Sequence, residues 1–247
     1  MLSPPPPHTC MFSANDDVVD TLAAFVQRAK ADDSVELETR IGTWKQNRFL
    51  PGVDRSTMDR LVRAMDSHSK EEDATVAALD DEWMELEDYF YTVTDRRMRT
   101  RVEYCPETMQ MTPMTIEKKP LAQMLLQTHL FDIRVSLAHE IRDEEPVKIV
   151  RPKHVRIKQF RRYKASASPF VITCAMTWSG ASFREAEENQ ATMEPTFEIE
   201  CELELPRDPL YRRRPNRHIA KSLLAKNVGI MFGDNIVFTR IAHDVDA

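Results

Sequence analysis

Val35-Glu36-Leu37-Glu38-Thr39-Arg40-Ile41-Gly42 alternates strictly between apolar and charged residues. Apolar side chains stand at 35, 37 and 41, and charged ones at 36, 38 and 40. A period of two predicts a β-strand, expected here over about residues 34–44. It would carry two carboxylates and a guanidinium on one face and aliphatic groups on the other.

A second stretch near the C-terminus, Phe197-Glu198-Ile199-Glu200-Cys201-Glu202-Leu203-Glu204-Leu205, repeats this alternation. Its four glutamates share one face of the expected strand over residues 195–205. Like charges on one face destabilise a sheet, so a positive group is needed to compensate them. A divalent cation with oxygen ligands is such a group.

Six further strand-like segments lie between these two. They cover about residues 83–93, 96–104, 109–119, 129–141, 153–164 and 169–178. The total of eight is even, and most of the connections are short. Closing an antiparallel sheet into a barrel leaves no exposed edge. We therefore expect a mainly β (α+β) fold, an eight-stranded antiparallel β-barrel.

Amphipathic helices are expected around this barrel. They are predicted at about residues 15–30, 57–65, 182–191 and 216–228. Ser56 is the expected N-cap of the second helix. The segment 1–14 is predicted to be a disordered Pro-rich tail, and 15–247 a single domain. The N-terminus has no secretory signal pattern, and no apolar run approaches the ~20 residues of a membrane helix.

The orientation of the strands decides what the barrel is for. If the apolar faces pointed inward, this would be an ordinary barrel with a charged exterior. Two observations favour a charged interior instead. Acidic strands stand at the ends of the array and basic ones in its middle, and the amphipathic helices need an apolar outer surface to cover. An outer-membrane barrel shares this polarity, but the interspersed helices and the missing signal argue against it.

The charged sets on the middle strands follow the same alternation. They comprise Arg97, Arg99 and Arg101; Glu117 and Lys119; Asp132, Arg134, Ser136 and Glu140; and Arg156 and Lys158. Glutamates hold Mg²⁺ or Mn²⁺ through oxygen, whereas arginines and lysines bind phosphate oxygens. Both together in one tunnel predict a metal bridged to a polyphosphate. The matching reaction is in-line attack of water on a terminal phosphoryl group.

Other chemistries are excluded by what the chain lacks. It contains no P-loop, nucleophile elbow or Rossmann pattern, and only five glycines are available to build one. The histidines show no metal-binding spacing, and the scattered cysteines favour reduced, buried thiols. The net charge of −6 argues against nucleic-acid binding over the whole surface but leaves room for a local basic channel.

Several motifs, in order, resemble the triphosphate tunnel metalloenzymes, and among them the fungal and protozoan type of mRNA-capping RNA 5′-triphosphatase. These motifs are VELETRIG at 35–42, PGV at 51–53, Asp132-x-Arg134-x-Ser136 with Glu140, Arg156-x-Lys158, and EIECE at 198–202. Each is weak alone, but their order and phase make the set specific. One departure is Phe160, which stands where a third basic residue is expected. Arg161 or Arg162 is the candidate replacement, through a β-bulge.

The resemblance implies roles for individual residues. It implies Glu36, Glu38, Glu198 and Glu202 as ligands of Mn²⁺ or Mg²⁺, and Glu140, Glu200 and Arg134 as catalytic residues. It implies Arg40, Arg97, Arg99, Arg101, Lys119, Arg156 and Lys158 as substrate-binding residues. Glu140 either orients the attacking water or forms a salt bridge. Arg40 either binds phosphate or balances Glu36 and Glu38, and Arg97 or Arg101 lies at the tunnel mouth and meets RNA.

The implied function is hydrolysis of the γ-phosphate from the 5′-triphosphate end of nascent mRNA, the first step of cap formation. Nucleoside triphosphate hydrolysis is the implied side activity, a capping guanylyltransferase the implied partner, and the nucleus the implied location, with no membrane involved. A tunnel phosphohydrolase of inorganic tripolyphosphate or thiamine triphosphate is the first alternative. Such relatives carry ExExK, whereas Arg40 stands here. The second is a non-catalytic module that binds polyphosphate or RNA ends, which would gain nothing from buried acids.

Overall fold

The computed structural model describes residues 16–69, 76–93, 96–105, 110–127, 131–143, 151–165, 169–204, 212–232 and 239–241. The predicted Pro-rich tail at 1–14 lies outside these residues. No described helix has both the length and the apolar character needed to cross a bilayer.

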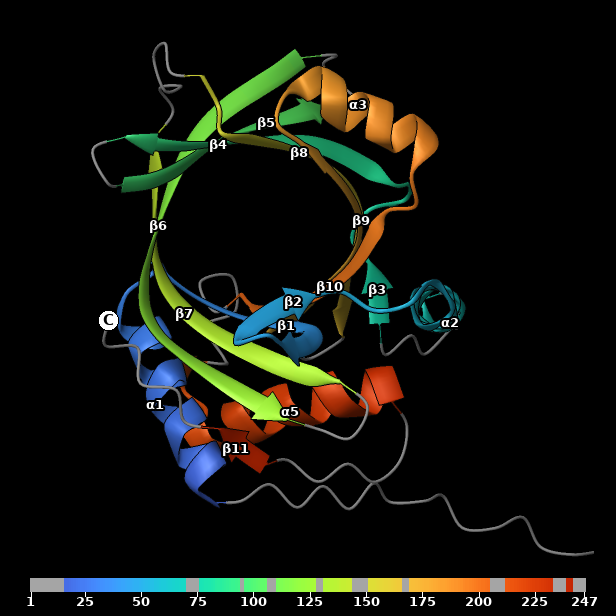
Figure 1. Ribbon diagram of the computed structural model, residues 1–247. Coiled ribbons are helices and arrows are strands. Elements are labelled where there is room, and N and C mark those ends of the chain that lie inside the picture. The colour runs from blue at the N-terminus through green and yellow to red at the C-terminus, as the bar shows by residue number, and fades with distance from the viewer. Residues whose placement is uncertain are drawn as a thin grey trace, which may run out of the picture.

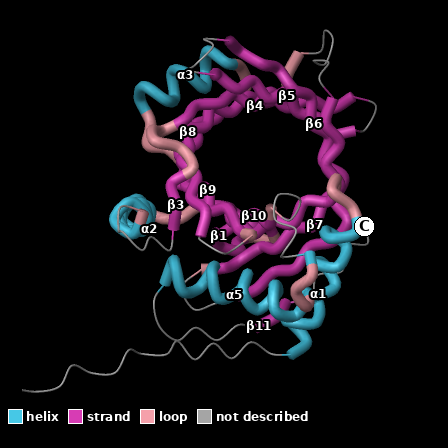
Figure 2. Tube along the Cα trace, turned by 180° about the vertical axis from the view of Figure 1, so that it is seen from behind, coloured by secondary structure: helices cyan, strands magenta, loops and turns pink. Residues whose placement is uncertain are grey.

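Eight long strands form a closed antiparallel barrel, which confirms the predicted fold (Figure 1). They are β1 (Val35–Lys45), β4 (Met84–Val93), β5 (Arg96–Cys105), β6 (Gln110–Gln127), β7 (Asp132–Asp143), β8 (His154–Ala165), β9 (Phe170–Gly180) and β10 (Thr196–Leu203). The ring runs β10-β9-β8-β4-β5-β6-β7-β1. It closes where β1 pairs with β10, with Glu38 opposite Glu202 and Arg40 opposite Glu200. Figure 2 shows the same ring from behind.

Three short strands extend this sheet. These are β2 (Arg48–Pro51), β3 (Val76–Ala78) and β11 (Thr239–Ile241), which pair with β1, β8 and β6. The hairpin between β1 and β2 turns through Gln46 and Asn47, both with positive φ. Two such residues in succession match a type I′ turn, whose twist suits tightly joined strands.

The four described helices lie outside the barrel. They are α1 (Asp16–Ala31), α2 (Arg55–His68), α3 (Phe183–Thr192) and α5 (Asn216–Phe232). α1 and α5 lie together against the β1 and β7 side of the ring, and α3 lies on its opposite side (Figure 1). The N-cap of α2 is Asp54, which accepts a hydrogen bond from the Thr57 amide at 2.9 Å, so the predicted Ser56 cap is wrong.

The main hydrophobic core lies between these helices and the outer face of the barrel. Leu37, Ile133 and Ile199 are buried in it, with at most 1% of their surface exposed. They pack with Leu22 of α1 and Leu223 of α5. Each such aliphatic side chain contributes roughly 1.5–3 kcal/mol by burial. The apolar faces therefore point outward under helices, and the charged faces point inward, as predicted.

Gly42 lets the β1–β2 hairpin fold tightly over the end of the barrel. A Cβ atom at this position would lie 2.1 Å from the Leu50 carbonyl oxygen and 2.8 Å from the Phe49 ring. Backbone cannot yield as a flexible side chain can. We expect Gly42→Ala to lower the free energy of unfolding by about 1–3 kcal/mol, the usual cost of overpacking. Chemical denaturation measures this, and stability equal to wild type would contradict the close approach.

β6 extends to Gln127, whereas the sequence predicted an end near 119. Pro120 interrupts the pattern, and a proline inside an apolar run suggests a strand end. The pairing register with β7 shifts between Pro120 and Ala122. Before the shift Lys118 lines the interior, and after it Met124 joins the outer core. Consequently the inward-facing residues beyond the shift are odd-numbered, such as Gln123 and Leu125.

Candidate active site

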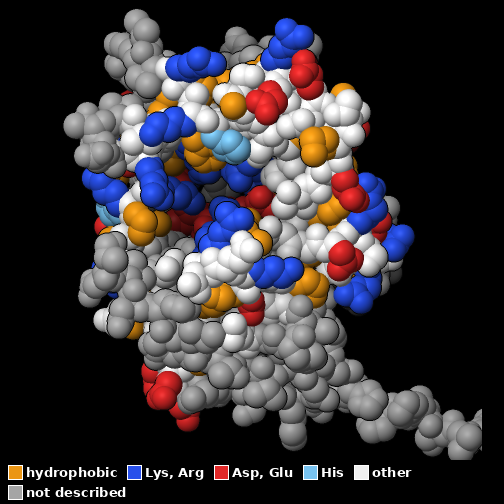
Figure 3. Space-filling view, viewed as in Figure 1, with side chains coloured by type: hydrophobic (Ala, Val, Ile, Leu, Met, Phe, Trp, Pro, Cys, Tyr) orange, Lys and Arg blue, Asp and Glu red, His pale blue; other side chains and the backbone are white. Residues whose placement is uncertain are grey.

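Three connected cavities run along the inside of the barrel. The central chamber, about 300 Å³, shares Glu38, Arg40, Arg99, Lys118 and Arg156 with a cavity of about 530 Å³ at one end. At the other end it shares Glu36, Glu140, Arg142, Glu202 and Glu204 with a second cavity of about 530 Å³. The predicted tunnel is therefore present. Figure 3 shows a hollow rimmed by Lys and Arg, with Asp and Glu deeper inside.

The two ends of the tunnel carry opposite charge. We call the first end the basic mouth, because seven cationic side chains line it against the single carboxylate of Glu38. The second end is the acidic mouth, which five carboxylates line against the single guanidinium of Arg142. A polyanion is attracted to the basic mouth and a cation to the acidic one.

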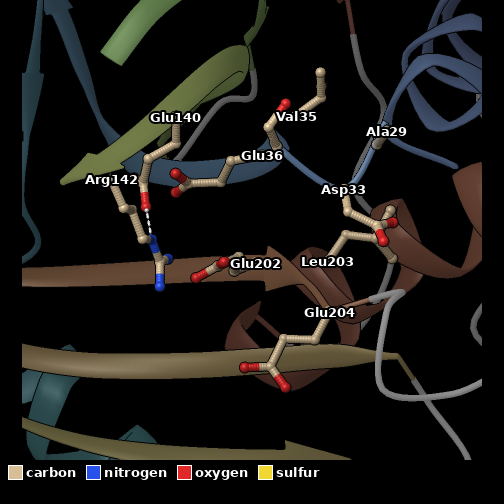
Figure 4. A pocket seen from close by; sticks show the side chains of 10 residues that line it. Ala29, Asp33, Val35, Glu36, Glu140, Arg142, Glu202, Leu203 and Glu204 are labelled. Atoms are coloured by element: carbon tan, nitrogen blue, oxygen red, sulfur yellow. Dashed lines mark hydrogen bonds and ion pairs between the residues drawn. The ribbon is translucent and has the colours of Figure 1, made fainter. Parts of the chain in front are cut away.

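A cluster of carboxylates marks the junction of the chamber and the acidic mouth. Glu36, Glu140 and Glu202 point into it from β1, β7 and β10 (Figure 4). Lys118 donates to Glu36 at 2.7 Å, and its ammonium lies 3.3 Å from Glu38 and 3.5 Å from Glu140. Glu202 has no ion pair with any described residue.

The pKa values in this cluster show that its carboxylates outnumber the nearby cations. Burial raises the pKa of Glu36, and Glu38 and Glu202 raise it further against the effect of Lys118, to about 9. Burial likewise raises the pKa of Glu202. For Glu38, burial acts in the same direction, but Arg40 and Lys118 outweigh it and hold the pKa below the usual range. In both Glu36 and Glu202, the raised pKa reflects a carboxylate whose charge is costly where it lies.

These observations bear on whether the cluster fits a divalent cation. All donors are carboxylate oxygens, which suit Mg²⁺ and Mn²⁺. The raised pKa values of Glu36 and Glu202 show that an added cation would be stabilising. Among the described residues, however, no three acidic, His or Cys side chains converge closely enough to hold an ion as they stand. Lys118 occupies the space between Glu36 and Glu38, so the donor set fits, with Lys118 in competition.

Glu200 forms ion pairs with two cations in the middle of the chamber, Arg40 and Lys158. Its carboxylate lies 3.1 Å from the Arg40 guanidinium and accepts a hydrogen bond from Lys158 at 3.1 Å. Burial opposes ionisation of Glu200, but Arg40, Lys158 and Arg156 keep its pKa well below the usual range. Arg40 also lies 3.2 Å from Glu38. It therefore balances the acidic strands at the seam where β1 meets β10.

Asp88 of β4 is a site residue that the sequence reasoning missed. It is fully buried and lies 3.0 Å from Arg101, 2.7 Å from Arg156 and 3.6 Å from Arg99. Burial disfavours its charge, but the three guanidiniums hold the pKa of Asp88 well below its usual value. The sequence did contain a signal for such a residue. Arg97, Arg99 and Arg101 lie in phase on β5, and so many cations require an acidic residue on a neighbouring strand.

Most of the predicted site residues line the tunnel. The central chamber contains Glu36, Glu38, Arg40, Arg99, Arg101, Glu140, Arg156, Lys158, Glu200 and Glu202. Arg97 lines the basic mouth, the position predicted for Arg97 or Arg101. Arg134, predicted as a catalytic residue, also lines the basic mouth and is not part of the central chamber. Glu140 accepts a hydrogen bond from Arg142 at 2.7 Å and lies 3.8 Å from Arg99. Among the described residues, the ion pairs of Glu140 are with Arg99, Lys118 and Arg142, and Arg134 is not one of its partners.

The predicted orientation of β6 is wrong. Lys118, not Lys119, faces the chamber. Lys119 is about half exposed and lies 3.9 Å from Glu117, which is bound by Arg96. The sequence offers two adjacent lysines, and the position of Glu117 two residues before Lys119 favours Lys119 as the inner one. An acidic residue paired on the outside gives no information about the inner face.

Two further predictions concern the ends of the glutamate and arginine strands. Glu198 accepts a hydrogen bond from Thr177 at 3.2 Å and lies 3.7 Å from Arg156, on the side of Glu200 away from Glu202. It is therefore separated from the carboxylate cluster.

Arg162 lines the chamber in phase with Phe160, and the pairing of β8 with β9 is regular there. The expected bulge is therefore absent, and the Arg162 guanidinium lies 2.7 Å from Asp80.

Comparison with known proteins points to one kind of structure. No protein-family model and no curated protein sequence matches the chain. Among solved structures, the S. pombe Pct1 RNA triphosphatase matches with a TM-score of 0.65 and 17% identity over 93% of this chain and 99% of that one. The Mimivirus capping enzyme triphosphatase matches with a TM-score of 0.56 and 10% identity over 88% and 98%.

At such identities the likeness concerns the path of the backbone, and it extends over nearly the whole of each neighbour. The closed ring of eight strands, the charged interior and the outer helices agree with it. The chain therefore has the tunnel fold of the RNA triphosphatases, the fold that its glutamate motifs predict.

Proposed function

We propose that this chain is a divalent-metal-dependent phosphohydrolase that removes the γ-phosphate from the 5′-triphosphate end of RNA. One observation carries the proposal: a carboxylate cluster and an array of cationic side chains share a single tunnel. Glu36, Glu38 and Glu202 supply the acids. Arg99, Lys118, Arg156 and Lys158 supply the bases. An anion-binding module would have no use for the buried acids.

The charge gradient gives the direction of binding. The triphosphate enters by the basic mouth, and its γ-phosphate lies deepest, beside Glu36 and Glu202. Arg99, Lys118, Arg156 and Lys158 neutralise the charge of the phosphate oxygens. Glu36, Glu38 and Glu202 would hold Mn²⁺ or Mg²⁺, which when bound polarises a phosphoryl oxygen.

Glu140 is positioned to orient the attacking water. Burial opposes its ionisation, but hydrogen bonding by Glu36 and the charges of Lys118 and Arg142 lower its pKa, so the carboxylate accepts hydrogen bonds at neutral pH. Water attacks the γ-phosphorus as the bond to the β-phosphate oxygen breaks. Inorganic phosphate and diphosphate-ended RNA are the products.

The test is release of labelled phosphate from γ-labelled, triphosphate-ended RNA in the presence of Mn²⁺, Mg²⁺ or a chelator. We expect turnover with metal and none with chelator. The same protein is assayed with inorganic tripolyphosphate and thiamine triphosphate. A strong preference for either would replace the RNA substrate with the alternative one. Binding of the RNA without any release would identify a non-catalytic module.

The two neighbouring lysines of β6 provide a matched pair for this assay. Lys118→Met removes a cation from the chamber, and we expect kcat/KM to fall by roughly 10- to 100-fold, the value of one charge-assisted contact to phosphate. Lys119→Met removes an exposed charge outside the barrel and is expected to stay within about twofold of wild type. Equal losses in both variants would contradict the orientation of β6.

The proposal also covers the partners of the protein and its location in the cell. One structural neighbour, the S. pombe enzyme, was solved in complex with the Spt5 CTD, and another is the triphosphatase domain of a trifunctional mimivirus mRNA capping enzyme. We propose that this chain likewise acts on nascent mRNA in the nucleus, ahead of a guanylyltransferase. Co-purification with guanylyltransferase activity tests the partnership.

A further inference from the structure

A further pocket lies beside the basic mouth, outside the central chamber. We call it the hairpin pocket; it is lined by Trp44, Arg48, Phe49, Gln123, Met124, Leu125 and Arg134. Its volume is about 310 Å³, near the lower end of the roughly 300–1,000 Å³ typical of small-molecule sites. Arg134 lines both the hairpin pocket and the basic mouth, so the two are neighbours.

The hairpin places an aromatic ring at the end of the tunnel. Gly42 stands in the same inward phase of β1 as Glu36, Glu38 and Arg40, and the Phe49 ring lies directly against it. Trp44 is paired with Phe49 across the hairpin. The backbone amide of Trp44 donates a hydrogen bond to Asp132 of β7, which ties the hairpin to the barrel wall.

Arg134 contributes a cation that has no direct ion pair among the described residues, although Glu38, Glu200 and Glu198 act on it from a distance. Its guanidinium stacks over the Phe49 ring at 4.8 Å from the centroid. No described carboxylate lies within ion-pair distance of it, whereas Arg99, Arg101 and Arg156 are all paired with Asp88. Burial and the nearby charge of Arg40 lower the pKa of Arg134, which indicates repulsion that an incoming anion would relieve.

The aromatic group on the opposite wall of the basic mouth is less available. The Phe90 ring is covered by the Arg156 guanidinium at 5.5 Å and by the His154 ring at 5.6 Å. Arg156 is held in turn by Asp88. Both Phe90 and Phe49 carry a stacked guanidinium, so the difference lies in the cation and in the His154 ring. Arg156 is held by Asp88, whereas Arg134 forms no ion pair with a described carboxylate, so the hairpin pocket is the stacking site whose cation is available to a ligand.

Aromatic rings, a stacked guanidinium and an amide such as Gln123 are the groups that bind an unpaired nucleobase. We propose that the hairpin pocket binds a nucleobase near the 5′ end of the RNA while the triphosphate lies in the tunnel. Arg48, exposed on the same hairpin, then contacts a backbone phosphate. This inference rests on the proposed function and deepens it, because it gives the enzyme a means to prefer RNA over tripolyphosphate, which has no base.

The first test compares two substrates in one variant. Trp44→Leu is assayed with a short triphosphate-ended RNA and with inorganic tripolyphosphate. We expect kcat/KM for RNA to fall about tenfold, mainly through KM, since stacking of one base contributes at this level. The value for tripolyphosphate is expected to change less than twofold. Trp83→Leu is the matched control, because Trp83 is exposed before β4, at the far end of that strand from Phe90, and should leave both substrates unaffected.

The second test does not depend on catalysis or on the folding of a core variant. Arg48→Gln changes only an exposed side chain. Its affinity for a short 5′-hydroxyl RNA is measured over a range of salt concentrations. We expect weaker binding and a salt dependence that is shallower by about 0.7 in log–log slope, the effect of one phosphate contact on single-stranded nucleic acid.

The outcomes separate this inference from the proposed function. A wild-type protein that hydrolyses neither substrate overturns the function. A wild-type protein that hydrolyses RNA, together with a Trp44→Leu variant that loses both substrates equally or neither, overturns the nucleobase site. If Trp44→Leu does not fold, the Arg48→Gln measurement decides: an unchanged affinity and salt slope overturn the site.

Discussion

Glu36→Gln is expected to lower the rate of phosphate release from triphosphate-ended RNA by about 10²- to 10³-fold, the range found when one electrostatic contact to the transition state is removed. The substitution keeps the size of the side chain and removes only its ability to carry charge. Glu36 lies where the central chamber meets the acidic mouth, together with Glu202 and Glu140.

The metal-free fold should tolerate this change. The pKa of Glu36 is raised to about 9 by burial and by its acidic neighbours, so the carboxyl is mostly neutral at pH 7 without metal. A neutral amide resembles that form. We therefore expect the Tm of the metal-free variant to match wild type within a few degrees. We expect Mn²⁺ to raise the Tm of wild type, as linkage requires of a ligand that binds only the folded state, and we expect the variant to lack this rise.

The control for this experiment is Glu187→Gln, which makes the same chemical change on the exposed face of α3. It should retain both the activity and the metal-dependent rise in Tm. Full activity in Glu36→Gln would remove Glu36 from the site. A rise in Tm equal to wild type would show that metal binds elsewhere.

Asp88→Asn is expected to lower the free energy of unfolding by about 3–5 kcal/mol, the usual result when one partner of a buried ionic group is removed. Asp88 is the shared counter-ion of Arg99, Arg101 and Arg156. Without its charge, three buried guanidiniums repel one another in the chamber. Urea denaturation at pH 7 measures the loss, and a change below about 1 kcal/mol would show that the arginines find other partners.

The pH dependence of this difference gives an independent check. The folded pKa of Asp88 lies well below its unfolded value of about 3.9. The stabilisation is therefore fully present above the unfolded pKa and is lost as the pH falls toward the folded one. The gap in stability between wild type and Asp88→Asn should be constant above about pH 5 and should shrink below about pH 4. Glu187→Gln, whose carboxylate is exposed, should show no comparable gap.

The sequence was informative where alternation was strict. From Glu36 to Arg40 in β1 and from Glu198 to Glu202 in β10, every second residue is charged. The apolar residues between them, such as Leu37 and Ile199, are buried under helices as predicted. A period of two assigns faces without knowledge of the partner strands. The eight strands of the barrel, their antiparallel pairing and the charged interior agree with the prediction from this pattern, whereas the short strands β2, β3 and β11 were not predicted.

The sequence was uninformative where the faces carry mixed residues. In β6, an inner lysine adjoins an outer one, and Pro120 introduces a register shift that no local pattern reveals. In β4, Asp88 stands between Leu86 and Phe90 on the inner face, so its strand looks nearly apolar there. The Phe49–Arg134 contact joins residues 85 positions apart, and only the fold of the hairpin over Gly42 creates it.

The unequal rims of the barrel have a kinetic meaning. Seven cations at one opening and five carboxylates at the other produce a potential that changes sign along the bore. Long-range steering then sorts approaching solutes before any contact is made. Polyanions are attracted to one opening and small cations to the other. The substrate and the metal ion therefore do not compete for the same route of entry.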